Sequence, residues 1–337
     1  MKIRFRMKHL TPLMASLAVC ALSGSLVGAE KLTVLLIDGQ NNHAWQETTP
    51  VMVKILKDSG RFDVTVSTSP DGPPKAPKAP GDKSDEAKAA FSAEMKAWEM
   101  AVAEHKKGIA AAWEQWRPQF ASYDVVVSNY NGEPWPEEVK LALEEYVKGG
   151  GGFVPVHAAN NSFPEWPAYN EMIGIGGWGG RSELSGPYLR LRGDKWINDS
   201  SVGKGGSHGQ QHEFVVVTQN AEHPIMKGLP TRWKHAKDEL YDRLRGPATS
   251  VNVLAAARSE EATGGSGEWE PSLMVIRYGK GRVFHTTLGH STESMSGLGF
   301  QETLKRGVEW AATGEVTFPA IDAAVLTEEK VATVPVN

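Results

Sequence analysis

The hydrophobic positions in the first part of the chain predict alternating strands and helices. Leu32–Ile37 and Phe62–Val66 are short runs rich in aliphatic residues, and each has the length of a buried strand. Between them, residues 47–59 place apolar side chains at helical spacing. A strand, a helix and a second strand in this order indicate a βαβ unit, which requires a parallel sheet.

The same alternation continues beyond residue 120. Val125-Val126-Val127 predicts a third strand, residues 137–147 predict a helix with one apolar face, and Phe153–Val156 predicts a fourth strand. Further along, Leu273–Tyr278 and Arg282–Thr287 flank a glycine-lysine-glycine turn, which indicates a β-hairpin. The expected fold class is α/β, with a mostly parallel sheet, helices on both faces and a C-terminal β-hairpin.

Three segments interrupt this pattern. Residues 69–84 are rich in proline and lysine, which predicts a solvated linker. Residues 85–116 have an amphipathic helical pattern and are expected to form a lid or a contact in a homodimer. Residues 164–209 lack periodicity and predict a long binding or lid loop. The expected organisation is a domain over residues 30–315, a linker and helical insertion within it at about 69–118, and a C-terminal tail over 316–337.

The first 29 residues have the pattern of a secretory signal peptide. Four basic residues precede an apolar run, Leu10–Val27, and small residues follow it. A retained membrane anchor is the alternative, but serine and glycine interrupt the run and make it a poor permanent span. Cleavage after Ala29 would leave a periplasmic or secreted protein without a membrane span. Lipidation of Cys20 stays open, because Leu17–Cys20 loosely resembles a lipoprotein box with Val19 in the place of a small residue.

Removal of this segment changes the thiol content and the charge of the chain. Its single cysteine would be lost, which excludes disulfides, cysteine nucleophiles and thiolate metal sites in the mature protein. Without the four basic residues, 32 basic and 40 acidic residues remain, a net charge of about −8. We expect no nucleic-acid binding from a chain of this charge.

Three of the predicted strands end in clusters of polar residues. Asp38 to His43 follow the first strand, Asn129 to Glu133 follow the third, and His157 to Asn161 follow the fourth. In open α/β sheets, ligands bind outside the carboxyl ends of the strands. We therefore expect a site at this edge with His157 at its centre, because histidine can act as a base or as a metal ligand. A buried structural histidine is the alternative.

Five segments together carry a resemblance to a known family. They are Tyr123–Val127, Gly151–Ala159, His223-Pro224-Ile225, Asp238–Tyr241 and Arg282–His290. In this order and spacing they resemble the trehalose-utilisation (ThuA-like) family, whose fold is similar to that of class I glutamine amidotransferases. The resemblance implies a flavodoxin-like or amidotransferase-like sheet. His157 stands where the amidotransferases have a nucleophilic cysteine, and an imidazole cannot form the glutaminyl thioester, so glutamine amidotransferase activity is excluded.

Histidine and carboxylate side chains remain as candidates for chemistry. We expect His157, His290 and Glu239 to be catalytic, with His157 as the general base. Two or three imidazoles with one carboxylate also suit a divalent metal such as zinc or manganese. The candidate metal ligands are His157, His208, His212 and His290, although the surroundings of His208 and His212 do not look helical.

The resemblance implies a small sugar as the substrate. An oxidised (3-keto) disaccharide or glycoside would lose a proton beside its ketone, leading to isomerisation or elimination, or would be hydrolysed. A non-catalytic carbohydrate-binding or partner-binding module is the alternative. Converging imidazoles would favour catalysis, whereas aromatic rings and amides alone would favour binding. The candidate substrate-binding residues are Asp38, His43, Asn129, Asn131, Asn160, Asn161, Trp166 and Tyr241.

Overall fold

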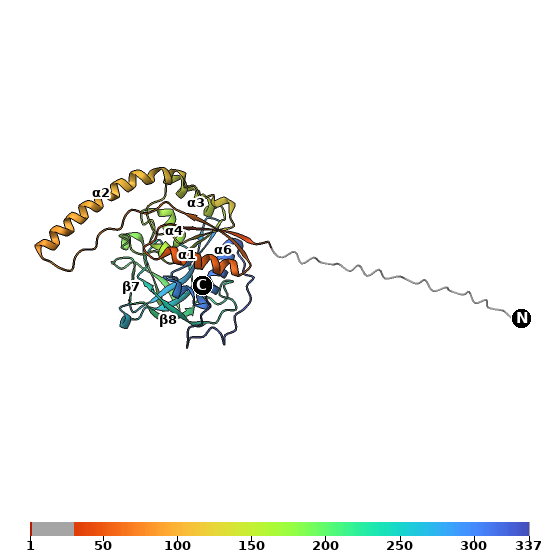
Figure 1. The fold of residues 1–337 in the computed structure, drawn as a ribbon. Coiled ribbons are helices and arrows are strands. Elements are labelled where there is room, and N and C mark those ends of the chain that lie inside the picture. Colours follow the sequence, from red (N-terminus) through yellow and green to blue (C-terminus); the bar gives the residue numbers. More distant parts are fainter. Residues whose placement is uncertain (2–29, 337) are drawn as a thin grey trace. The chain divides into compact units, whose positions relative to one another are not determined.

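A central sheet organises the computed structural model, which describes Met1 and residues 30–336 (Figure 1). Within the described residues, nine of its strands pair in the order β2-β1-β3-β4-β13-β12-β11-β8-β9. The predicted α/β class with a large central sheet is confirmed. The predicted signal peptide and Cys20 lie outside the described residues. The bounds of the nine strands are β1 (Leu32–Asp38), β2 (Phe62–Thr68), β3 (Val125–Ser128), β4 (Gly152–Pro155), β8 (His212–Thr218), β9 (Arg232–Asp238), β11 (Val251–Arg258), β12 (Trp269–Tyr278) and β13 (Gly281–Thr286).

The half of the sheet from β2 to β13 is parallel and has helices on both of its faces. Every residue of β3 and β4 is buried, as expected for strands covered on both sides. Alternate residues of β1 enter two different cores, Val34 and Leu36 in one and Leu35 and Ile37 in the other. The first core includes side chains of α1 (Trp45–Asp58) and α6 (Leu298–Thr313), and the second includes those of α3 (Glu137–Gly149) and α4 (Pro167–Ile173).

The direction of pairing changes at β13. This strand pairs in parallel with β4 and antiparallel with β12, and β12, β11, β8 and β9 follow in antiparallel pairs. Tyr278 of β12 lies opposite Gly281 of β13, so the two strands are joined by a tight turn inside the sheet, and α5 (Thr292–Met295) and α6 come after them. Four changes of direction give β9 the same direction as β1, β4 and β13. The carboxyl ends of these strands therefore point the same way.

Residues 164–209 contain more regular structure than their sequence predicts. They include α4, the hairpin of β5 (Tyr188–Arg192) and β6 (Lys195–Asp199), and β7 (Ser207–His208), which pairs with β10 (Tyr241–Asp242). The prediction of one long loop is wrong here, because each element is too short for a periodic pattern to stand out. Four short 3₁₀ helices complete the described elements: η1 (Phe120–Ser122), η2 (His157–Asn161), η3 (Glu183–Ser185) and η4 (Glu261–Thr263).

Helix α2 (Asp85–Gln115) is the long orange helix in Figure 1. Ser84 caps its N-terminus, and none of its 31 residues is buried. Residues 70–80 of the linker before it have no regular structure and contact the helix through the Trp98 indole, which donates to the Pro74 carbonyl over 2.7 Å. A role of α2 in a homodimer stays a prediction.

No helix of the described residues has both the length and the apolar character needed to cross a membrane.

Candidate functional site

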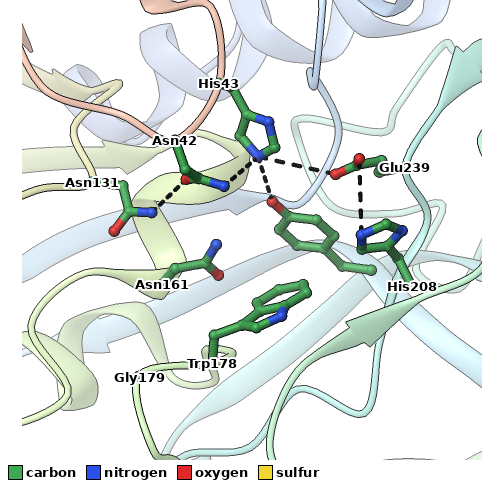
Figure 2. Close-up of a pocket in the computed structure, with 9 residues that line it drawn as sticks. Asn42, His43, Asn131, Asn161, Trp178, Gly179, His208 and Glu239 are labelled. Atoms are coloured by element: carbon green, nitrogen blue, oxygen red, sulfur yellow. Dashed lines mark hydrogen bonds and ion pairs between the residues drawn. The ribbon is translucent and has the colours of Figure 1, made fainter. Parts of the chain in front are cut away.

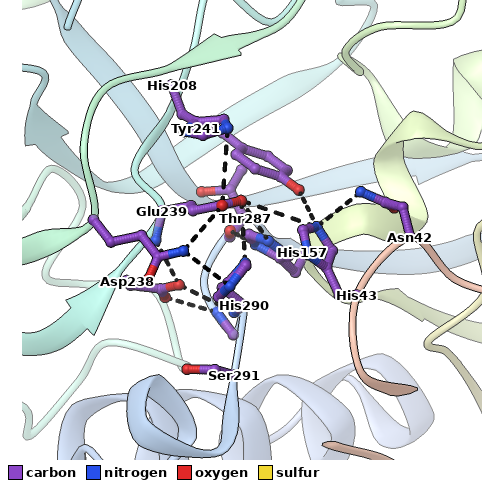
Figure 3. Close-up of polar contacts among 12 residues, drawn as sticks. Asn42, His43, His157, His208, Asp238, Glu239, Tyr241, Thr287, His290 and Ser291 are labelled. Carbon is purple, nitrogen blue, oxygen red and sulfur yellow. Dashed lines mark hydrogen bonds and ion pairs between the residues drawn. The ribbon is translucent and has the colours of Figure 1, made fainter. Parts of the chain in front are cut away.

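Three histidines converge on one carboxylate oxygen at the carboxyl edge of the sheet. Oε2 of Glu239 lies 3.1 Å from Nδ1 of His290, 3.7 Å from Nε2 of His157 and 3.9 Å from Nε2 of His43 (Figure 3). The four residues come from segments that follow β9, β13, β4 and β1. The direction shared by these strands explains how positions so far apart in the chain meet.

His157 is held in one orientation. It starts η2 with a left-handed φ of 48°. Residues other than glycine rarely adopt this backbone conformation, and those that do are often found at functional sites. Its Nδ1 lies 2.7 Å from the carbonyl oxygen of Thr287. A carbonyl only accepts, so Nδ1 carries the proton of the neutral ring and Nε2 keeps a lone pair. This Nε2 is buried and has no hydrogen-bond partner within the described residues.

Asp238 fixes the two loops that carry Glu239 and His290. Its carboxylate accepts the backbone N–H groups of Glu239 at 2.8 Å, Gly289 at 2.8 Å and His290 at 3.0 Å. Nε2 of His235 lies 2.8 Å from the same carboxylate. Burial raises the pKa of Asp238, but the hydrogen bond and charge of His235 outweigh it, so the pKa lies below its usual value.

The groups of the cluster shift one another's pKa values. Burial lowers the pKa of His43 to about 4, with further lowering by His157 and His290. Burial raises the pKa of Glu239, but contacts with His157 and His290 outweigh it, and the net shift is downward. Burial lowers the pKa of His290, but Glu239 more than compensates and raises it. At neutral pH, Glu239 is therefore anionic and His43 is neutral.

The cluster fits a divalent metal ion. His43, His157, Glu239 and His290 each offer one ligand atom, and these atoms lie within 4.8 Å of one another. Three imidazoles and a carboxylate match the ligand types of zinc and manganese, and zinc binds such ligands at about 2.0–2.2 Å. Nε2 of His157 lies 3.7 Å from Oε2 of Glu239, and either a proton on this nitrogen or a cation between the two atoms makes the contact favourable.

A pocket of about 460 Å³ opens beside the cluster (Figure 2). Tyr241 forms one wall; its ring stacks on that of His157 at 4.2 Å, and its hydroxyl lies 3.1 Å from Nε2 of His43. Trp178 meets Tyr241 edge-on at 4.7 Å. The residues that line the pocket are Asn42, His43, Asn131, Asn161, Trp178, Gly179, His208, Glu239 and Tyr241.

The structure brings many of the predicted site residues together. His157, His290 and Glu239 meet in the cluster. His43, predicted as a substrate-binding residue, is there as a further candidate ligand. His208 lines the pocket, 3.8 Å from Oε1 of Glu239, and does not belong to the four-residue cluster. Among the predicted substrate-binding residues, Asn131, Asn161 and Tyr241 also line the pocket.

Other predicted residues are placed elsewhere. Asp38, Asn129 and Asn160 are buried and bonded internally, to Thr68, to Thr48 and Thr49, and to His285 respectively. These side chains stabilise the loops and do not line the pocket.

Trp166 and His212 also lie apart from the pocket. Trp166 packs in an aromatic cluster with Trp135, Phe163 and Tyr169. His212 begins β8 and lines a different cavity, with Nδ1 2.7 Å from the carbonyl oxygen of Gln210. It is not among the four clustered residues.

Some functional positions could not be recognised from the sequence. Trp178 lines the pocket but does not follow a strand, and Asn42 lines it too, although it was not named as a candidate among the polar residues after the first strand. Gln211 approaches both His290, with nitrogen atoms 3.1 Å apart, and Glu239, to which it donates over 3.2 Å.

Gly205–Gly209 matches the G-x-S-x-G spacing of a hydrolase nucleophile, but Ser207 lies in the short strand β7 and not at a strand-to-helix turn.

Comparisons with known proteins agree with this architecture. A family model named ThuA and described as trehalose utilisation matches residues 78–311. A ThuA-like protein from Parabacteroides merdae, known from a crystal structure, is 40% identical with a TM-score of 0.76, over 90% of this chain and 98% of that chain. A ThuA-like protein from Bacteroides uniformis is 17% identical with a TM-score of 0.51, over 88% of this chain and 98% of that chain, and shows the fold alone. No curated protein matches the chain.

Proposed function

The chain belongs to the ThuA family of trehalose-utilisation proteins, and from this premise we propose that it is an enzyme of carbohydrate metabolism. Its proposed substrate is an oxidised (3-keto) disaccharide or glycoside. The observation that carries the proposal is the convergence of three imidazoles on Glu239 beside an open pocket. A carbohydrate-binding module would need rings and amides but would gain nothing from three imidazoles aimed at one carboxylate oxygen.

In this proposal, His43, His157, His290 and Glu239 hold a divalent cation such as zinc or manganese. When bound, the cation would polarise the ketone oxygen of the substrate or activate a water molecule. Asp238 keeps Glu239 and His290 in place through their backbone N–H groups. Outer hydrogen bonds of this kind orient ligands and sustain metal affinity.

His208 is the residue that we propose as the general base, in place of His157. Its Nδ1 lies 2.7 Å from the carbonyl oxygen of Gly209, so Nδ1 carries the proton of the neutral ring and Nε2 is free to accept one. The side chain is 37% exposed and lines the pocket. Nε2 would take the proton from the carbon beside the ketone, and the C–H electron pair would form the enolate double bond.

Two outcomes can follow from this enolate. Isomerisation follows when the proton returns to the former ketone carbon and the neighbouring hydroxyl passes its proton to the former ketone oxygen. Elimination follows when the bond from the β-carbon to the glycosidic oxygen breaks, and that oxygen keeps the electron pair and takes up the proton. Attack by an activated water molecule would instead give hydrolysis. Asn131 and Asn161 supply amides for sugar hydroxyls, and the Trp178 ring offers an apolar surface for one face of the sugar.

The proposal is tested by metal analysis and a substrate screen on the same protein. Purified wild type is compared with His157→Ala and with His212→Ala, a control histidine outside the cluster. We expect wild type and His212→Ala to contain about one equivalent of metal and to turn over a 3-keto disaccharide but not the unmodified sugar. His157→Ala should lose both properties. If His157→Ala keeps its metal and activity, or if wild type has neither, the proposal is wrong.

We also propose that the protein acts in the periplasm or outside the cell, on the basis of the basic and apolar pattern of residues 1–29. N-terminal sequencing of the protein from its native host should find Glu30 as the first residue. A chain that still begins at Met1 would contradict export by cleavage.

The parallel half of the sheet supports a flavodoxin-like arrangement, which we propose as the finer description of the fold. Its strand order, β2-β1-β3-β4-β13, follows the flavodoxin order 2-1-3-4-5 when the parallel strands alone are counted. In that order the chain reverses direction across the sheet between β1 and β3. The loops after these two strands supply His43 and Asn131 to the site.

A further inference from the structure

A second cavity, of about 680 Å³, adjoins the pocket beside the cluster. It lies between the loop after β1, the linker after β2 and helix α2. Asn42 and Asn131 line both cavities. Nδ2 of Asn131 donates to Oδ1 of Asn42 over 2.6 Å, and the other end of the Asn42 amide lies 3.2 Å from Nε2 of His43. The two cavities are therefore separated by one pair of amides, which also touches the candidate metal site.

The outer wall of the second cavity is fixed in place on the β1 side. The backbone N–H of Ser69 donates to the Asp38 carbonyl over 2.9 Å, which continues the pairing of β1 with β2. Gln40 donates to the Pro70 carbonyl over 2.8 Å and accepts from the backbone of Glu133 over 3.0 Å. This one side chain joins the linker to the loops after β1 and β3.

The same wall is fixed on the α2 side. His105 Nε2 lies 3.1 Å from the carbonyl oxygen of Asp71, and the Trp98 indole bonds Pro74. His105 and Ile109 of α2 also line the cavity. These hydrogen bonds hold the linker against α2 beside the site. The cavity between them is therefore formed before a ligand binds.

The lining of the second cavity suits a sugar ring. Trp45 stands at the start of α1 and is half-exposed, whereas Trp135 and Trp166 pack within the aromatic core. Gln46, which is exposed and lines the same cavity, adds an amide group. An aromatic plane combined with amide groups matches the apolar face and the hydroxyls of a pyranose. The first cavity, at about 460 Å³, and the second, at about 680 Å³, are both within the range of small-molecule sites.

We propose that the second cavity binds the second ring of the substrate while the first cavity holds the ring that reacts. The linker and α2 then determine the size of the substrate, and the protein prefers a two-ring sugar or a glycoside to a single oxidised ring. This inference rests on the proposed function, since it assigns the reacting ring to the pocket beside Glu239. The ridge formed by Asn42 and Asn131 would lie beneath the bond that joins the two rings.

The test is calorimetric binding of 3-ketotrehalose and 3-ketoglucose to full-length wild type and variants. Trp45→Ala should weaken binding of the two-ring sugar by about 10-fold or more and leave the one-ring sugar unchanged. Gln46→Ala, an exposed position that should not disturb folding, should weaken the two-ring sugar by about 2-fold to 10-fold. Trp269→Ala is the matched control, because this half-exposed indole lines a different cavity.

The outcomes separate the subsite from the proposed function. If both variants affect the two sugars equally, or affect neither, the second cavity is not a subsite, although binding by wild type would still support a sugar substrate. If wild type binds neither sugar, the proposed substrate class fails and the subsite fails with it. A change confined to the two-ring sugar, absent in Trp269→Ala, supports the assignment.

Discussion

The cluster around Glu239 and helix α2 differ in how their side chains are held. In the cluster, His157 and Asp238 are 3% and 0% exposed, and each is oriented by hydrogen bonds to buried groups. In α2, none of 31 residues is buried; two side chains bond to the linker, and the partly buried Trp113 packs against the core. Chemistry that needs fixed geometry is thus built on the sheet edge. The selection of substrate size is left to a peripheral element that can vary without disturbing the sheet.

The largest expected effect comes from removing the charge at the centre of the cluster. Glu239→Gln leaves three imidazoles without the anion that they share, and the new amide nitrogen cannot bind a cation. We expect affinity for Zn²⁺ and Mn²⁺ to fall by about 100-fold or more, since changes outside the first ligand shell already cost 10-fold to 100-fold. Chelator competition at pH 7.5 measures this loss.

Glu213→Gln is the control for that variant, because Glu213 is exposed at the start of β8. If Glu239→Gln binds either metal within about 3-fold of wild type, the cluster is not a metal site. Variants of α2 should leave metal affinity unchanged. A loss of metal affinity in an α2 variant would show that the helix helps to hold the cluster in place.

The same distinction explains how much could be predicted from the sequence. Strands of the parallel half were recognisable because fully buried strands are continuous apolar runs bounded by turn residues, as in β3 and β4. His43, His157 and His290 were named because each follows a predicted strand, whereas Glu239 was named as a carboxylate in one of the segments that carry the family resemblance. Their mutual arrangement could not be predicted, because it depends on loop conformations such as the left-handed φ of 48° at His157.

The roles of individual histidines were harder to predict than their importance. His208 and His212 have the sequence spacing of a ligand pair, yet one lines the pocket and the other lines a separate cavity. Their spacing has meaning on a helix, where residues four apart share a face. Here β7 ends at His208 and β8 begins at His212, so the chain turns between them.

A buried histidine behind the cluster should make stability depend on pH. Burial lowers the pKa of His285 to about 4, and its ring is bonded to Asn160 and to the Ile173 carbonyl. In the unfolded chain, His285 is protonated as the pH falls below about 6.5. In the folded protein, it is protonated only near pH 4. The stabilisation is therefore complete above pH 6.5 and is lost as the pH falls towards 4. We expect a loss of about 2 kcal/mol between pH 7 and 5.

Urea denaturation of metal-free protein at pH 7, 6 and 5 measures this contribution. His285→Gln should be less stable than wild type at pH 7, because a buried hydrogen-bonded ring is replaced, but its stability should fall less steeply with pH. If wild type and variant have the same pH dependence, His285 is not the group responsible. Performing the experiment with EDTA removes the separate effect of pH on metal binding.

A glycine-to-alanine substitution should have opposite effects on stability in α6 and in α2. A Cβ atom on Gly307 of α6 would lie 1.9 Å from Cδ1 of Phe284, a fully buried residue of β13. Gly307→Ala must therefore displace the ring or the helix. We expect a loss of about 1–3 kcal/mol in the free energy of unfolding, measured by urea denaturation. An unchanged stability would mean that the contact between α6 and the sheet is looser than the structure shows.

Gly108→Ala in α2 should have the smallest effect and the opposite sign. A Cβ atom at this position has no heavy atom within 4 Å, so the methyl group meets only solvent. Alanine is the better helix former by about 1 kcal/mol, and this gain should slow amide hydrogen exchange within α2. Global unfolding and metal affinity should not change, because the helix has no buried residues and the added methyl group lies apart from Trp113, which packs against the core. If Gly108→Ala instead destabilises the protein or alters its oligomeric state, this face of α2 is covered by another copy of the chain, and the contrast between a buried site and an exposed peripheral helix no longer holds.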